Sequence, residues 1–306
     1  MSKVVESRSK FKTILLTILA VVFVIFILVP IVFAIFDGSK SGNVALIPIE
    51  GVITADGASS LGQSSISSKD IVDFIKEANE NPNVKVILLE INSPGGSAVA
   101  SDEIASAVKK SSKPVVSLIR EAGASGAYWI ASATSHIIAN RMSITGSIGV
   151  ISSYLEFSGL MDKYGVGYER LVAGEVKDMG NPYQKLTDNE KTILQKKLNT
   201  IHDFFIQEVA ENRHLSESKV RDLATGEFYL GVEAINLGLI DQLGDQNTME
   251  QYLKTTYTLE EVEYVKYEPQ EGFFDLLQNV LSQFSFSMGR GISSLLVEKD
   301  SNIMLL

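Results

Sequence analysis

The chain has 306 residues, of which 45% are hydrophobic and 21% charged, a composition typical of a globular protein with a sizeable core. Its net charge of -10 at pH 7 argues against nucleic acid as a partner, because phosphate binding needs clustered lysine and arginine. The chain contains no cysteine, which excludes disulfides, thiolate metal ligands and a cysteine nucleophile.

The first predicted element is a membrane-spanning helix over residues 14–36, within an anchor segment of residues 13–36. Residues 14–36 carry no charge, and Thr17 is their only polar side chain. As a helix they would span roughly 35 Å, enough to cross a hydrocarbon core of about 30 Å. Basic residues precede them, so the positive-inside rule places residues 1–12 in the cytoplasm and the chain beyond the anchor outside it. A cleaved signal peptide ending at residues 32–34 is the alternative, but the apolar run exceeds the usual signal core of about 7–15 residues.

Beyond the anchor the composition divides the chain into three parts. Residues 37–43 form a polar linker, residues 44–270 a folded domain, and residues 271–306 a C-terminal helix and tail. Within the folded domain, short apolar runs rich in β-branched residues alternate with helical patterns. This alternation indicates one α/β domain built from repeated βα units.

The predicted elements of the domain follow in chain order. We expect strands at residues 44–49, 84–91, 115–119, 136–139, 148–151 and 168–172. We expect helices from a Ser68 cap to Pro82, over residues 98–108, directly after Ser125, over residues 157–164 with Gly165 as stop signal, and from a capping box at Thr187 and Glu190 to about residue 212.

Two glycine-rich turns are candidates for chemistry, since each follows a predicted strand and opens a predicted helix. The first, Asn-Ser-Pro-Gly-Gly-Ser at residues 92–97, exposes backbone N–H groups at a helix start, although a plain strand-to-helix connection has the same pattern. The second, Gly-Ala-Ser-Gly-Ala at residues 123–127, places the Ser125 hydroxyl near free backbone donors. It is similar to a nucleophile elbow with Ala127 at the final glycine position, while an N-cap serine is the ordinary alternative.

A serine nucleophile needs a base, and the histidines of this chain are poorly placed. His202 and His214 fall inside or at the end of the long polar helix, where solvated histidines are usual, and His136 follows Ser125 too closely for most triads. A lysine is therefore the natural candidate, provided that desolvation or nearby cations lower its pKa. Lys177 lies just after a predicted strand among small and apolar residues.

Four motifs follow one another along the chain: Ser-Pro-Gly-Gly at residues 93–96, Ala-Ser-Gly-Ala-Tyr-Trp-Ile at 124–130, Thr-Gly-Ser-Ile-Gly-Val at 145–150 and Ala-Gly-Glu-Val-Lys-Asp at 173–178. In these motifs the chain resembles the signal peptide peptidase A family, serine–lysine proteases on the Clp protease/crotonase fold. The similarity runs from about residue 44 to residue 244 and matches the short single-domain form. Ala127 is the departure, because the family often has glycine there.

The resemblance implies a role for each site residue. Ser125 would be the nucleophile and Lys177 the general base. Ser147 would hold the lysine amine in place, and the backbone N–H groups of Gly96 and Gly126 would form the oxyanion hole.

The resemblance also implies a membrane-anchored endopeptidase that degrades cleaved signal peptides and other short hydrophobic peptides, assembles as a homo-oligomer and needs no metal or cofactor. The expected location is the cell membrane, with the lipid bilayer bound through residues 14–36 and the catalytic domain outside the cytoplasm. A crotonase-like acyl-thioester enzyme and a catalytically inactive scaffold are the alternatives. The anchor argues against the first, and the presence of both Ser125 and Lys177 argues against the second.

Overall fold

The structure is a computed structural model that describes residues 16–21, 23–28, 41–57 and 64–269. One compact unit covers Ser41–Glu268, and residues 1–40 with 269–306 form a second unit. The predicted cytoplasmic segment, residues 1–12, most of the linker at residues 37–43, and the predicted C-terminal helix and tail at residues 271–306 lie outside the described residues.

The predicted anchor is described only in part. Residues 16–21 are helical, and a π-helical stretch, η1, covers Val24–Leu28. Across the described parts of the chain, we find no helix with the length and apolar character needed to cross a membrane. Residues 14, 15, 22 and 29–36 of the predicted span lie outside the described residues, so the anchor stays a prediction.

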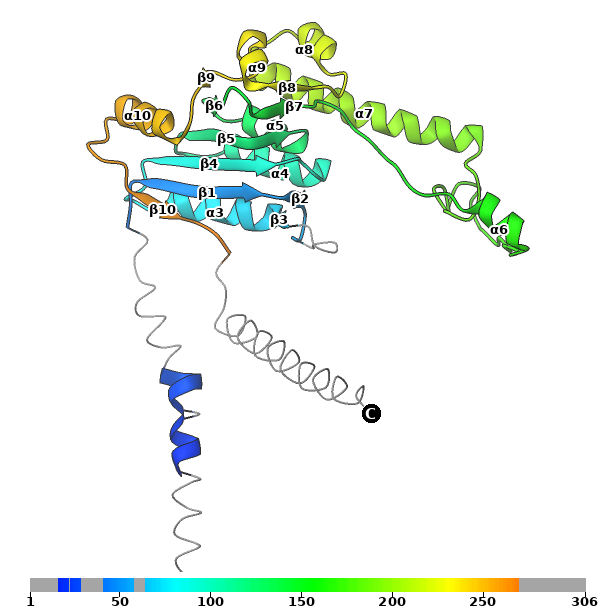
Figure 1. The fold of residues 1–306 in the computed structure, drawn as a ribbon, viewed down its shortest axis with the longest axis horizontal. Helices are drawn as coiled ribbons and strands as arrows, with labels where there is room; N and C mark the ends of the chain where they lie inside the picture. Colours follow the sequence, from blue (N-terminus) through cyan, green and yellow to red (C-terminus); the bar gives the residue numbers. More distant parts are fainter. Residues whose placement is uncertain (1–15, 22, 29–40, 58–63, 270–306) are drawn as a thin grey trace, which may run out of the picture. The chain divides into compact units, whose positions relative to one another are not determined.

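A mostly parallel sheet forms the centre of the compact unit (Figure 1). The strands are β1 (Val44–Glu50), β2 (Val52–Thr54), β3 (Ser65–Ser67), β4 (Val86–Ser93), β5 (Val115–Ala124), β6 (Ile137–Ala139), β7 (Ile144–Gly146), β8 (Phe228–Leu230), β9 (Gln242–Leu243) and β10 (Tyr264–Lys266). The main sheet has the order β10-β1-β4-β5-β6-β9, and β7 pairs with β5 and, antiparallel, with β8. The other described pairs are parallel, including the separate pair β2–β3.

Helices cover both faces of this sheet. The helices of this unit are α3 (Ser68–Glu80), α4 (Ala98–Lys109), α5 (Gly126–Ser132), α6 (Ser158–Tyr164), α7 (Asp188–Asn212), α8 (Glu217–Leu223), α9 (Gly231–Leu237) and α10 (Gln246–Tyr257), of which α6 lies away from the sheet. The apolar stripes of α3, α4, α5 and α7 share one buried cluster with the inward side chains of the strands. Met249 and Leu253 of α10 pack on the other face. Burial of both faces explains why the central strands are almost continuously apolar in sequence, and it confirms the α/β prediction.

Most predicted elements are present, with shifted ends. The capping box joins Thr187 and Glu190 at the start of α7, and Gly165 ends α6 in the left-handed conformation, as predicted. The cap of α3 is Ser67 instead of Ser68, and β5 continues beyond Ile119 to Ala124 because it gains β7 as a partner.

The strands predicted at residues 148–151 and 168–172 were wrong. Both segments are described and neither forms a ladder. Leu171 is 98% exposed and Ile151 is 89% exposed, and among the described residues the single backbone hydrogen bond from Gly226 to Ile148 O does not extend into a ladder. A segment with high strand propensity forms a strand only where a partner backbone is available.

We call residues 151–187 the arm. Figure 1 shows that the chain leaves β7, extends to α6 and returns to the start of α7. Every residue of the arm, all of them described, is exposed or half-buried. Its exposed apolar side chains are Ile151, Tyr154, Leu155, Phe157, Leu160, Tyr164, Val166, Tyr168, Leu171, Val172 and Tyr183. The arm therefore has no core of its own.

Candidate active site

Ser125 occupies a sharp turn between β5 and α5. Its backbone has φ 53° and ψ -126°, a strained conformation for a residue with a Cβ. Two hydrogen bonds hold it there: the Ser125 N–H donates to Gly146 O over 2.8 Å, and the Trp129 N–H donates to Ser125 O over 3.0 Å. Within the described chain its side chain makes no capping hydrogen bond. The geometry is that of a strand-to-helix elbow that presents a hydroxyl, in contrast to an ordinary N-cap serine.

The Pro-Gly-Gly turn packs directly against this elbow. Gly95 has φ +97°, and a Cβ at that position would lie 2.7 Å from Gly126 N. A Cβ on Gly96 would lie 2.0 Å from Ile53 O. Ile53 belongs to β2, and this strand holds the turn in place. The Ile53 N–H donates to Gly95 O over 3.0 Å, and the Ser97 N–H donates to Ile53 O over 2.8 Å. Both glycines are therefore required by close backbone approach.

Two backbone donors lie beside the serine. A Cβ on Gly126 would lie only 3.3 Å from Gly96 N, so the two glycines are neighbours across the turn. Among the hydrogen bonds of the described residues, neither the Gly96 N–H nor the Gly126 N–H has an acceptor. Unpaired N–H groups next to a nucleophile can stabilise an oxyanion.

A pocket of about 680 Å³ opens over the elbow. Its apolar part is built around Trp129 and Phe205, whose rings stack with centroids 4.7 Å apart. The pocket is lined by Pro94, Gly96, Ser97, Ala98, Ser125, Gly126, Trp129, Ser147, Gly149, Val150, Ile151, Gln195, Leu198, Asn199, Ile201, His202, Phe205, Ala224, Thr225 and Gly226. The site thus combines a serine hydroxyl, two backbone donors and a cavity with both apolar and polar walls.

Ser147 lies at the end of β7 and lines the same pocket. It too has a left-handed backbone, with φ 51°. Its N–H donates to Glu227 O over 2.9 Å, and its Oγ donates to Gly226 O over 3.2 Å. The predicted Ser125, Gly96, Gly126 and Ser147 therefore meet at one place.

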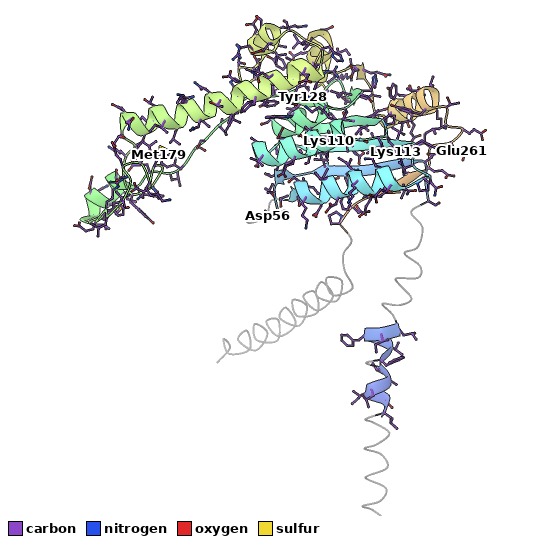
Figure 2. All side chains as sticks on the ribbon, turned by 180° about the vertical axis from the view of Figure 1, so that it is seen from behind. Asp56, Lys110, Lys113, Tyr128, Met179 and Glu261 are labelled. Atoms are coloured by element: carbon purple, nitrogen blue, oxygen red, sulfur yellow. The ribbon has the colours of Figure 1, made fainter. Side chains whose placement is uncertain are left out.

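Lys177 is not brought to this place by the single chain. It lies in the arm with an exposed side chain, in a turn where its N–H donates to Gly174 O over 3.0 Å, and it is not among the residues that line the pocket. Figure 2 labels Met179, two residues further on, at the far end of the arm, and Tyr128 of α5 in the body of the unit.

The turn that carries Lys177 is ordered by Arg170. The Arg170 guanidinium donates to Glu175 O over 3.0 Å and to the Asp178 carboxylate over 2.8 Å. The hydrogen bond from Arg170 lowers the pKa of Asp178 to about 2. The loop is therefore ordered within the arm even though the arm is exposed.

His202 was expected to be solvated, and this was wrong. It is half-buried on α7, lines the pocket, and its Nε2 lies 3.3 Å from Ile148 O. The sequence did carry a signal, since His202, Phe205, Ile206 and Val209 follow the i, i+3, i+4, i+7 spacing of a buried helix face. His136, in contrast, stacks on Tyr252 with centroids 4.0 Å apart and does not line the pocket.

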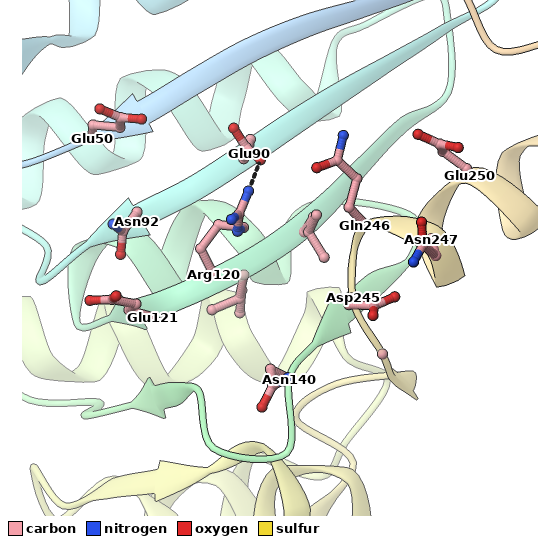
Figure 3. A pocket seen from close by; sticks show the side chains of 13 residues that line it. Glu50, Glu90, Asn92, Arg120, Glu121, Asn140, Asp245, Gln246, Asn247 and Glu250 are labelled. Atoms are coloured by element: carbon pink, nitrogen blue, oxygen red, sulfur yellow. Dashed lines mark hydrogen bonds and ion pairs between the residues drawn. The ribbon is translucent and has the colours of Figure 1, made fainter.

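A second hollow, of about 720 Å³, is lined by residues of β1, β4 and β5 and by the start of α10 (Figure 3). Its charged lining consists of Glu50, Glu90, Arg120, Glu121, Asp245 and Glu250. Among the described residues that line it, Arg120 is the cation, and it pairs with Glu90 over 2.5 Å. Within the part of the chain that the structure describes, no serine, lysine or histidine lines it, and no group of three or more His, Asp or Glu side chains could hold a metal ion. The serine pocket is therefore the better candidate for hydrolysis.

Comparison with known proteins gives a consistent result. The profile described as peptidase family S49 matches residues 107–260, a stretch that contains Ser125, Ser147 and Lys177. A protein assigned as a protease in Methanocaldococcus jannaschii is 33% identical over 238 residues, which cover 76% of this chain and 75% of that protein. A protein assigned as signal peptide peptidase SppA in Enterococcus faecium is 33% identical over 236 residues, which cover 76% of this chain and 69% of that protein. Protease 4 of Haemophilus influenzae is 33% identical over 208 residues, 67% of this chain and 33% of its own length.

Proposed function

Because this chain belongs to peptidase family S49 and is a serine-type peptidase, we propose that Ser125 is its nucleophile, Lys177 its general base and short hydrophobic peptides its substrates. One observation carries the proposal. The strained elbow at Ser125 adjoins two backbone N–H groups that lack acceptors among the described residues, and it lines a pocket with an apolar part. Strain of this kind persists where function requires it.

The chemistry follows from these positions. Ser125 Oγ attacks the peptide carbonyl while the lysine amine takes its proton, and the carbonyl oxygen becomes an oxyanion. The N–H groups of Gly96 and Gly126 receive that charge, and each such donor is worth about 2.7–4 kcal/mol. Collapse breaks the C–N bond, the lysine returns the proton to the leaving amine, and water then hydrolyses the acyl-enzyme by the same route.

Lys177 has to reach Ser125 for this mechanism to run. The arm that carries Lys177 exposes many apolar side chains, which favours burial against another copy of the chain. In the proposed homo-oligomer, Lys177 of one subunit serves Ser125 of its neighbour. An arm that folds back onto its own pocket is the competing arrangement.

Mixing two inactive proteins distinguishes these arrangements. Ser125→Ala and Lys177→Ala proteins are unfolded, combined in equal amounts and refolded together. If each site takes its serine from one subunit and its lysine from the next, the mixture should recover about a quarter of wild-type activity, because subunits mix at random in a symmetric ring. Each variant refolded alone is the control. A mixture as inactive as its parts would show that serine and lysine must come from the same chain.

The substrate proposal is supported by the apolar part of the pocket around Trp129 and Phe205, and by the name of the Enterococcus faecium relative, a signal peptide peptidase. The uncharged residues 14–36 support a location at the cell membrane with the catalytic unit outside the cytoplasm. We expect the full chain in detergent to cleave a synthetic hydrophobic signal peptide and to take a fluorophosphonate label that Ser125→Ala abolishes. Labelling at another serine, or cleavage by Ser125→Ala, would refute the assignment. Protease added to spheroplasts should digest the catalytic unit, and protection of that unit would refute the orientation.

A further inference from the structure

The turn that carries Ser147 is held by a neighbouring loop at residues 225–227. The antiparallel pair β7–β8 ends with Gly146 opposite Phe228, and the two backbone segments continue side by side beyond this pair. Ser147 N–H donates to Glu227 O over 2.9 Å, and Gly226 N–H donates to Ile148 O over 3.2 Å. A third hydrogen bond runs from Ser147 Oγ to Gly226 O over 3.2 Å. This loop therefore sets both the backbone and the side chain of Ser147.

The third hydrogen bond decides what the Ser147 hydroxyl can offer. A hydroxyl has one proton to donate and two lone pairs, whereas a carbonyl oxygen can only accept. Because Gly226 O takes the Ser147 proton, Ser147 Oγ presents only lone pairs to the pocket. An amine beside it must donate an N–H to it.

This polarity matters to a lysine that acts as a base. A neutral amine has two N–H donors and one lone pair, and only the lone pair can take the Ser125 proton. If Ser147 donated to that lone pair, the base would be blocked. If Ser147 accepts an N–H, the lone pair stays free and the amine is oriented.

We propose that Gly226 is a positioning residue, whose carbonyl holds the Ser147 hydroxyl as a pure acceptor and so keeps the lysine lone pair open toward Ser125. The inference rests on the proposed serine–lysine function and adds a residue that acts only through Ser147. The Ser147–Gly226 pair sits inside one chain, whichever subunit supplies the lysine.

The backbone explains why glycine stands at position 226. Its φ is +88°, and a Cβ added there would meet nothing within 4 Å. Conformation, not space, therefore selects glycine. The approach of the two turns depends on a second glycine, since a Cβ on Gly149 would lie 3.0 Å from the Gly226 Cα. A residue at position 226 that leaves the left-handed region would turn the carbonyl away, and the Ser147 hydroxyl would lose its hydrogen-bond acceptor.

Two substitutions at position 226 separate conformation from bulk. Asparagine tolerates positive φ far better than alanine although it is larger. With the full chain in detergent and a fluorogenic hydrophobic peptide, Gly226→Ala should lower kcat by about tenfold to a hundredfold with KM little changed, since small misplacement of catalytic groups has effects of this size. Gly226→Asn should stay within about threefold of wild type, because it can keep the backbone conformation. A larger loss for asparagine than for alanine would mean that bulk in the pocket matters, and would overturn the proposal.

Gly238→Ala is the matched control. Gly238 has φ +83° at the end of α9, outside the pocket, and its added Cβ would meet the tip of Leu215 at 3.3 Å and the end of the Lys219 side chain at 4.0 Å. This variant carries similar backbone strain and should lower the melting temperature without changing kcat. A comparable loss of kcat in Gly238→Ala would attribute the Gly226 effect to general destabilisation.

A double-mutant cycle tests whether Gly226 acts through Ser147. In a Ser147→Ala background the hydroxyl is gone, so adding Gly226→Ala should change kcat by less than about twofold, the signature of coupled residues. A full, additive loss would overturn the inference. If Gly226→Ala does not fold, the test uses Gly226→Asn. Adding Ser147→Ala to this variant should lower kcat by the same factor as adding it to wild type. A smaller loss of kcat in the Gly226→Asn background would refute the proposal. Failure of the proposed function is distinct, because it would appear as an active Lys177→Ala protein.

Discussion

The Ser125 elbow and the arm that carries Lys177 are opposite in character. Around the elbow, Ala127, Tyr128 and Ile130 are completely buried, and the strained serine is held by a backbone hydrogen bond to Gly146 of β7 and by one from Trp129 of α5. In the arm no such core exists, and Lys177 lies in an exposed turn. The proposed nucleophile and the proposed oxyanion donors are therefore positioned by the core of one chain, whereas the position of the proposed base depends on what the arm packs against.

The largest effect on activity is expected when Ser125 of the elbow or Lys177 of the arm is replaced. Ser125→Ala and Lys177→Ala should each lower kcat/KM by more than about 1,000-fold, and the double variant should be little worse than either, because the two act as a unit. Peptide cleavage and melting temperature measure activity and folding separately. His136→Ala, which alters a stacked histidine outside the pocket, is the control and should keep full activity. A Lys177→Ala protein with more than a few per cent of activity would remove the arm from the mechanism.

Two arginine–aspartate pairs offer a matched comparison of the regions. Arg170 binds Asp178 in the arm, and Arg213, whose side chain is 8% exposed, binds Asp241 beside the sheet. Arg170→Gln should reduce kcat/KM about tenfold, because it removes the hydrogen bonds that order the Lys177 turn. The melting temperature should not fall, because Arg170 contacts no buried core among the described residues. Arg213→Gln should lower the free energy of unfolding by about 1.5–3 kcal/mol, as expected for a hydrogen bond to a charged group. Its activity at 25 °C should be unchanged, and identical behaviour of the two variants would refute the contrast.

His202 sharpens the comparison because it is the one histidine that lines the pocket and belongs to the body of the unit. If a neutral lysine is the base, activity should rise with pH as the amine loses its proton. His202→Gln should then lose less than about tenfold in kcat/KM and keep the pH limb in place, because it removes only a wall residue and the contact to Ile148 O. Disappearance of a limb near pH 6.5 in this variant would instead make His202 the base.

The smallest expected effect is a pH dependence of the core pair. Burial pushes the pKa of Asp241 up, but hydrogen bonding and the charge of Arg213 outweigh it and hold this pKa below its usual value. A depressed carboxyl pKa stabilises the fold above the unfolded value and is lost as pH falls through the folded value. Melting temperature should therefore drop as pH falls below about 4, and should drop less in Arg213→Gln. An equal drop in both proteins would assign the acid sensitivity to other carboxylates.

The local features of this protein could be predicted from sequence because short-range physics decides them. The capping box at Thr187 and Glu190 and the stop at Gly165 depend on neighbours within one turn of helix. The glycine turns at residues 92–97 and 123–127 were visible because each sits between an apolar strand and a helix. The motifs around them were enough to indicate the family.

Other features were decided only by the tertiary structure. Residues 168–172 have a strand-like pattern and form no strand, since strand formation requires a partner backbone that the arm does not meet. His202 enters the pocket because the buried stripe of α7 turns it there, although the helix is polar overall. The strain at Ser125 and the close approach of Gly95 to Gly126 arise from three distant segments that constrain one another. The sequence determined which residues could react, and packing between distant segments decided which of them meet.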